Sequence, residues 1–167
     1  MGSAPAIIRR SLTSAFGIVI GKRYNAFMSK FNFTYPVSIR YSDLDPQWHV
    51  NNGRFLAYCE TARLQYMRKL GLFDGKSFND LPLIVADVHV RYIEPIEPTD
   101  EAVVSMGVTR IGNKSLVMEY EVTTPDGARC YATAETVMVA YDYYEKKSVP
   151  VSAELRKTIS DFEGKTF

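Results

Sequence analysis

The sequence predicts an α+β domain in which an antiparallel sheet of about five strands packs against one long helix. Two observations lead to this prediction. One stretch with helical spacing of apolar residues, 52–70, separates two regions whose apolar residues alternate. The later region, 84–140, holds four alternating runs joined by short connections, which is typical of antiparallel strands. We expect the only long crossover between the first strand and the second, and a meander thereafter.

The first strand and the helix follow each other closely. The strand is expected over 35–41, where apolar and aromatic residues occupy every second position. The helix starts near Asn52, and Gly71 is suited to end it. Six residues share one helical face and should be buried. They are Phe55, Tyr58, Cys59, Ala62, Tyr66 and Leu70.

Four further strands are expected after Pro82, each with an inward-facing row at every second position. The sequence Pro125-Asp126-Gly127 predicts a tight turn before the last strand. A short C-terminal helix should begin at Ser152. The inward rows run from Ile84 to Tyr92, Ala102 to Val108, Leu116 to Val122 and Cys130 to Ala140.

Composition excludes several classes of function. A chain of 167 residues fits one domain, and its net charge of +1 gives no electrostatic case for binding nucleic acid or a membrane surface. Its two cysteines are too few for a disulfide framework and lack metal-ligand spacing. We therefore expect a reduced intracellular environment, no metal and no cofactor.

The N-terminus differs from the rest of the chain. Residues 1–30 hold five basic residues and no acidic one, with Ser and Thr among apolar residues at helical spacing. This pattern is typical of a mitochondrial targeting segment, and the alternative is a helix that packs on the domain or on a partner. Its longest apolar run is too short to span a membrane. We divide the chain into a 1–34 extension and a 35–167 domain, with mitochondrial localisation expected and cytoplasm otherwise.

Residues 43–52, DLDPQWHVNN, gather two carboxylates, a histidine and two asparagines between hydrophobic segments. A turn followed by an Asn helix cap explains each residue singly. Together they suggest chemistry, because a helix starting at Asn51 or Asn52 presents free N–H groups that can hold an oxyanion. Asp45 could then attack a carbonyl or deprotonate water, with His49 assisting. The chain has no G-x-S-x-G or HExxH motif, so these parts favour hydrolysis of an activated acyl compound.

The segment RYSDLDPQWHVNNGRFLAYCETAR, residues 40–63, resembles the 4-hydroxybenzoyl-CoA thioesterase-like branch of the hotdog-fold acyl-CoA thioesterases. The shared pattern is D-x-x-x-H-V-N-N followed by E-x-A-R, and weaker likeness covers about residues 35–162. The resemblance implies a sheet wrapped around its central helix and hydrolysis of acyl-CoA to a free acid and coenzyme A. It also implies a homodimer or homotetramer with active sites at the dimer interface.

The same resemblance assigns roles to single residues. Asp45 matches the catalytic nucleophile or general base, the Asn52 N–H the donor that polarises the thioester carbonyl, and His49 the motif histidine. Gln47 stands where an assisting Asn occurs in related acyl-carrier thioesterases. Asn51 and Glu60 are candidates for support at the site.

Four further residues are candidates for contact with the substrate. Lys114 and Ser115 match a turn that tends to contact coenzyme A, and Arg129 is a second candidate for its phosphates. Trp48 stands where Gly or Gln is usual in the family. Its bulk could narrow the site or cover an acyl tunnel, which leaves the acyl preference open.

Two alternatives to thioester hydrolysis remain. His49 and Glu60 could serve a hotdog hydratase or dehydratase, although the H-V-N-N context lacks the H-F-P-G pattern of those enzymes. Hydration of crotonyl-CoA without thiol release would identify that activity. A non-catalytic acyl-CoA-binding module would be stabilised by acyl-CoA and release no thiol.

Overall fold

The computed structural model describes residues 30–77 and 81–167, so the predicted targeting segment lies almost wholly outside the described residues. A 3₁₀ turn, Tyr41–Asp43, separates the first strand from the long helix. The elements in chain order are β1 (Phe33–Val37), α1 (Asn52–Lys69), β2 (Leu83–Tyr92), β3 (Ala102–Ile111), β4 (Ser115–Thr123), β5 (Cys130–Asp142), β6 (Lys147–Ser148) and α2 (Ala153–Glu163).

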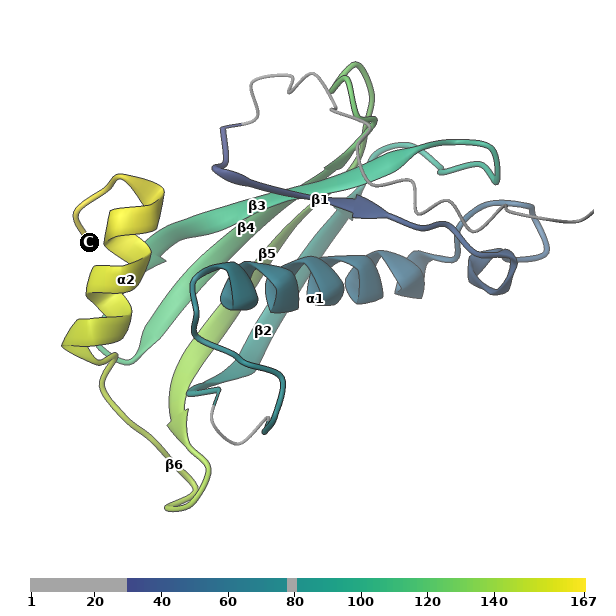
Figure 1. The fold of residues 1–167 in the computed structure, drawn as a ribbon. Helices are drawn as coiled ribbons and strands as arrows, with labels where there is room; N and C mark the ends of the chain where they lie inside the picture. Colours follow the sequence, from purple (N-terminus) through teal and green to yellow (C-terminus); the bar gives the residue numbers. More distant parts are fainter. Residues whose placement is uncertain (1–29, 78–80) are drawn as a thin grey trace, which may run out of the picture.

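The sheet has the strand order β1-β3-β4-β5-β2, with every neighbouring pair antiparallel and β6 added beside β5. Helix α1 lies across one face of it (Figure 1), which confirms the α+β prediction. The predicted meander is wrong for β2, which pairs with β5 and not with β3. Segment 93–101 carries the chain across three strand spacings, about 14 Å, a distance that this length of chain easily covers. A second crossover therefore exists that local sequence patterns did not reveal.

Strand β1 is displaced from its predicted range, beginning at Phe33 and ending at Val37. The chain leaves the sheet because the carboxylate of Asp43 accepts the backbone N–H of Arg40 at 3.0 Å, closing the 3₁₀ turn. Tyr41, predicted to continue the strand, lies in this turn with its side chain 83% exposed.

Helix α1 forms where its periodicity predicts. The side chain of Asn51 caps it by accepting the Gly53 N–H at 2.9 Å, and Gly71 follows its end with φ of +71°. Leu70 of the predicted face is partly buried and packs against the core. The buried residues of the helix are Phe55, Tyr58, Cys59, Ala62, Tyr66 and Met67.

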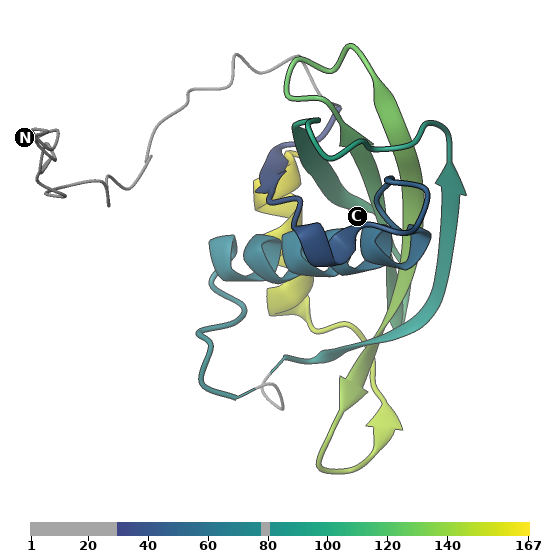
Figure 2. The ribbon, with the colours of Figure 1, turned by 90° about the vertical axis from the view of Figure 1, so that its right-hand side faces the viewer.

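The inward rows of β3 and β4 are buried as predicted, whereas β2 departs from prediction. A β-bulge between Val85 and Asp87 shifts the alternation of side chains by one residue. Leu83 and Val85, before the bulge, therefore lie on the same face of the sheet as Val88 and Tyr92 after it. Val85, Val88 and Tyr92 are 40–46% exposed. Figure 2 shows β2 along the free edge of the sheet. The helix of this chain therefore leaves the apolar face of its edge strand uncovered.

Helix α2 packs against β3 near the other edge of the sheet, beyond the end of β1. Ser152 caps its start by accepting the Leu155 N–H at 3.1 Å. Near its end, one oxygen of the buried Glu163 carboxylate accepts the Tyr66 hydroxyl at 2.6 Å and the Val108 N–H at 3.0 Å. Strand β1 pairs with β3 only as far as Met106, so Glu163 satisfies an edge N–H that β1 does not reach. No helix in the described part of the chain is long and apolar enough to cross a membrane.

Candidate active site

The loop before α1 is a three-residue hairpin. Leu44 and Val50 form an isolated bridge, and the Asp45 N–H donates to the His49 carbonyl at 2.9 Å. The Trp48 N–H donates to the Asp45 carbonyl at 3.0 Å, and Trp48 itself has φ of +60°. Three-residue hairpin loops commonly end in such a left-handed residue, where glycine fits best. The left-handed backbone therefore explains why glycine suits this position, and it makes the backbone of Trp48 strained.

The Asp45 side chain is fixed by the same loop. Its Oδ1 accepts the backbone N–H of Gln47 at 2.9 Å and that of His49 at 3.3 Å. Within residues 30–77 and 81–167, its Oδ2 accepts no hydrogen bond. The carboxylate is thus held by one oxygen and open at the other, and it is half-buried.

The start of α1 supplies an open donor beside this carboxylate. The Asn51 N–H donates to the Asp43 carbonyl at 2.8 Å, and the Gly53 and Arg54 N–H groups are taken by the side chain and carbonyl of Asn51. The Asn52 N–H has no acceptor among the described residues. An unpaired N–H at the positive end of an 18-residue helix is suited to an anionic oxygen.

A surface hollow of about 420 Å³ brings these groups together. The Tyr92 hydroxyl donates to the Asn52 carbonyl at 3.0 Å, so the end of β2 is fastened to the start of α1. Asp45, Gln47, His49 and Asn52 thus meet at one site, as the motif predicts, and Asn51 supports them from behind as the cap. The hollow is lined by Asp45, Gln47, His49, Val50, Asn52, Phe55, Tyr92, Ile93, Glu94 and Pro95.

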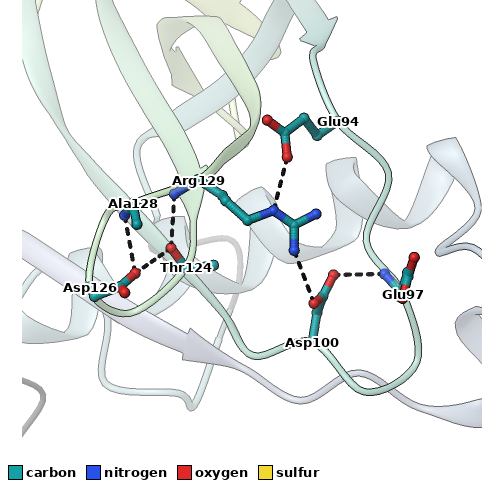
Figure 3. A network of polar contacts seen from close by, with 7 residues as sticks. All are labelled: Glu94, Glu97, Asp100, Thr124, Asp126, Ala128 and Arg129. Carbon is teal, nitrogen blue, oxygen red and sulfur yellow. Dashed lines mark hydrogen bonds and ion pairs between the residues drawn. The ribbon is translucent and has the colours of Figure 1, made fainter.

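The wall of this hollow is anchored by contacts that the sequence did not reveal. The Val50 N–H donates to the carbonyl of the buried Ile96 at 2.9 Å. Arg129 bridges Glu94 at 2.9 Å and Asp100 at 3.2 Å, as Figure 3 shows. This guanidinium is engaged by two carboxylates, so it stabilises the crossover segment and is poorly suited to hold coenzyme A phosphates.

Asp43 is a structural residue. Its buried carboxylate accepts the Tyr58 hydroxyl at 2.9 Å and the Arg40 N–H, and Arg54 lies 3.5 Å away. Burial, and then this hydrogen bond, raise the pKa of Tyr58. The two carboxylates of the motif therefore differ. The contacts of Asp43 stabilise the fold, whereas Asp45 keeps one oxygen without a hydrogen bond among the described residues.

The remaining candidate residues do not reach this hollow within one chain. Lys114 contacts Ser148, with Nζ 3.3 Å from its carbonyl oxygen. Ser115 pairs with Val139, seven residues along β5 from the partner of Tyr92, which separates them by roughly 20 Å. Glu60 is exposed and lies 3.8 Å from Arg63.

Among the described residues, neither Cys59 as a nucleophile nor a metal site is supported. Cys59 is buried in the core, and burial raises the pKa of its thiol to about 12, so it is no nucleophile at neutral pH. In the part of the chain that the structure describes, no three His, Cys, Asp or Glu residues are grouped so as to hold a metal ion.

An antiparallel sheet with a helix across one face (Figure 1) is the hotdog arrangement that the sequence resemblance implies. The model of the thioesterase-like superfamily matches residues 39–159, and the chain belongs to this family. Two curated relatives share 23% identity with it. They are the long-chain acyl-CoA thioesterase FadM of Escherichia coli, over 74% of this chain and 93% of the relative, and the 1,4-dihydroxy-2-naphthoyl-CoA hydrolase of Synechocystis, over 78% and 96%.

A solved structure gives stronger likeness. A thioesterase from Thermus thermophilus, complexed with coenzyme A and Zn, is 33% identical, with a TM-score of 0.73. The match covers 83% of this chain and 99% of that one. The likeness therefore extends over the whole of that domain.

Proposed function

We propose that this protein hydrolyses acyl-CoA thioesters to a free acid and coenzyme A. One observation carries the proposal. The carboxylate of Asp45, which is hydrogen-bonded through Oδ1 alone, and the unpaired N–H of Asn52 line the same hollow. The relatives support it, since FadM is named as a long-chain acyl-CoA thioesterase and the Synechocystis protein as a 1,4-dihydroxy-2-naphthoyl-CoA hydrolase.

The chemistry needs only these groups and water. In the general-base route, Oδ2 of Asp45 takes a proton from water while the water oxygen bonds to the thioester carbonyl carbon. The carbonyl oxygen becomes an oxyanion and accepts the Asn52 N–H. Collapse of the intermediate breaks the carbon–sulfur bond, and the leaving thiolate takes the proton that Asp45 returns through His49 or solvent. In the nucleophilic route Asp45 itself bonds to the carbonyl carbon and the carbon–sulfur bond breaks to release coenzyme A. Water then cleaves the resulting anhydride to the free acid and restores the Asp45 carboxylate.

We further propose that the working form is a homodimer joined along β2. Val85, Val88 and Tyr92 lie exposed on one face of an edge strand, a combination that favours association. A two-fold axis near Val88 would pair the two β2 strands antiparallel and extend the sheet. The helix of the partner subunit would then cover the apolar face that this chain leaves open.

Such pairing would also complete the site. A second hollow, of about 560 Å³, lies where β2 begins and is lined by Glu60, Arg63, Met67 and Val85 among others. Antiparallel pairing sets the beginning of one β2 beside the end of the other, and therefore this hollow beside the partner's Asp45. Lys114 lies at the same end of the sheet, its carbonyl accepting the Ala140 N–H. In the proposed dimer, Glu60, Lys114 and Ser115 of one subunit would therefore lie near the active site of the other.

The direct test is thiol release from short, long, branched and aromatic acyl-CoAs by the wild type and the Asp45→Asn variant. Asparagine keeps the acceptor for Gln47 and His49 but cannot act as base or nucleophile, so we expect turnover to fall by at least about a hundredfold. Asp161→Asn, an exposed aspartate on α2 paired with Lys157, is the matched control and should retain activity.

The outcomes separate the alternatives. Near-normal hydrolysis by Asp45→Asn would refute the role of Asp45. Hydration of crotonyl-CoA without thiol release would favour the hydratase, and thermal stabilisation by acyl-CoA without thiol release over hours would favour a binding module.

A further inference from the structure

Two large aromatic side chains stand exposed beside Asp45. Tyr41 is 83% exposed and Trp48 60%, and their ring centroids lie 6.3 Å apart with the planes at 65°. This edge-to-face arrangement is a favourable aromatic geometry. The pair nevertheless leaves most of its apolar surface in water, and nothing in the described residues covers it.

Trp48 occupies this place at an energetic cost. Its φ of +60° lies in the left-handed region, which costs an L-residue roughly 1–2 kcal/mol and glycine almost nothing. Backbone strain of this kind concentrates at functional sites. A glycine would close the same hairpin without strain and without an exposed indole, so the side chain itself needs an explanation.

A hollow lined by the two rings adjoins the candidate active site. It measures about 360 Å³, and Asp45 lines both this hollow and the one that holds Asn52. A thioester whose carbonyl lies at Asp45 has two arms, and one arm can enter each hollow. The aromatic hollow is lined by Tyr41, Ser42, Leu44, Asp45, Pro46 and Trp48.

We propose that Tyr41 and Trp48 bind the acyl group of the substrate and select for apolar chains or rings. The proposal rests on the proposed thioesterase function and names the part of the substrate that this hollow receives. Trp48 is three residues from Asp45, at most about 10 Å along the chain, which matches the first carbons of an acyl group.

Charge argues against placing the coenzyme A phosphates in the aromatic hollow, as it does for the hollow of Asn52, whose lining also lacks Lys and Arg. The lining of the aromatic hollow includes no Lys or Arg, and its one charged group is the carboxylate of Asp45. Phosphates bind where cationic donors cluster, and a carboxylate repels them. An apolar acyl group gains from burying the two rings and has no charge to satisfy.

Trp48 is the only tryptophan of the chain, so its fluorescence reports on this hollow directly. The Asp45→Asn variant, which we expect to bind substrate without turnover, is titrated with octanoyl-CoA, benzoyl-CoA and free coenzyme A. We expect the two acyl thioesters to change the Trp48 emission, with a blue shift for octanoyl-CoA, and free coenzyme A to leave it unchanged. No response to any ligand, or an equal response to free coenzyme A, would overturn the proposal. A shift that follows protein concentration alone would show that a second copy covers the rings, and would overturn it as well.

A kinetic test uses two left-handed residues. Trp48→Gly should lower the ratio of kcat/KM for octanoyl-CoA to that for acetyl-CoA about tenfold without lowering Tm, because glycine relieves the strain. Lys146, with φ of +52° in the β5–β6 turn, provides the matched control. Lys146→Gly should leave the ratio unchanged. Tyr41→Ala should lower the ratio in the same direction as Trp48→Gly.

The two proposals fail separately. An unchanged ratio in Trp48→Gly sinks acyl selection by the rings even when the enzyme is active. Absence of hydrolysis sinks the proposed function, while the fluorescence titration still decides whether the acyl group meets Trp48.

Discussion

Asp45 and His49 are joined by two hydrogen bonds that both use the backbone of His49. The Asp45 N–H donates to the His49 carbonyl at 2.9 Å, and the His49 N–H donates to Oδ1 of Asp45 at 3.3 Å. The imidazole takes no part in either, although His49 lines the candidate active site. The backbone of His49 therefore positions the Asp45 carboxylate, and any chemistry of His49 would come from its imidazole.

This separation makes the role of the imidazole testable. His49→Ala keeps the backbone N–H that holds Asp45 but removes the ring that would protonate the leaving thiolate. We expect kcat for thiol release to fall by about a hundredfold with little change in KM, which is the lower range for loss of a general acid or base. Circular dichroism checks the fold. Wild-type kcat in this variant would show that only the backbone of His49 is needed.

The dimer proposal predicts the behaviour of the β2 edge. Val88→Asp places two carboxylates near the proposed axis, where like charges repel, so the protein should become a monomer of about 19 kDa in light scattering. Thiol release should fall at least about tenfold, because each site loses the partner's hollow. Tyr144→Asp, at an exposed aromatic in the β5–β6 turn, is the control. A wild-type chain that already runs as a monomer with full activity would refute the dimer.

Local patterns were sufficient to predict helix α1 and the buried rows of β3 and β4. Each depends on the spacing of residues within one segment, and burial follows that spacing. Strand β2 shows what such patterns miss. The bulge at Ala86 changes which residues face inward, and pairing with β5 is decided by segments about 50 residues apart. Both outcomes depend on long-range contacts that no short window contains.

For the candidate site, too, the sequence predicted what depends on neighbouring residues and missed what depends on distant ones. Asp45, His49 and Asn52 were found because they lie within eight consecutive residues, and the hairpin keeps them together. The ion pairs of Arg129, a candidate phosphate ligand, could not be predicted, because its carboxylate partners lie 29 and 35 residues away. The left-handed conformation of Trp48 was also invisible, since the sequence shows only an unusual residue type.

Alkaline pH should weaken the fold. Burial raises the pKa of Cys59 to about 12, and that of Tyr66 is raised by burial and by its bond to Glu163. Groups with a raised folded pKa contribute stability that is complete below their unfolded pKa, near 9 and 10, and is lost as pH rises beyond it. The free energy of unfolding in urea should therefore fall by about 2 kcal/mol between pH 8 and pH 10.5. Cys59→Ala should reduce this pH-dependent difference, and an identical difference in the variant would contradict the assignment.

A side chain at Gly107 should destabilise the fold, because Glu163 of α2 lies against this glycine. A Cβ there would stand 3.0 Å from both carboxylate oxygens of Glu163 and 3.1 Å from the ring of Phe31. Gly107→Ala must displace the carboxylate that holds Tyr66, so we expect urea unfolding to show a loss of about 1–3 kcal/mol. Gly112→Ala is the control, since its new Cβ would meet nothing closer than 3.5 Å. In a Glu163→Ala background the same Gly107 change should cost less, because the carboxylate is gone. An equal cost in both backgrounds would show that Glu163 does not exclude the side chain.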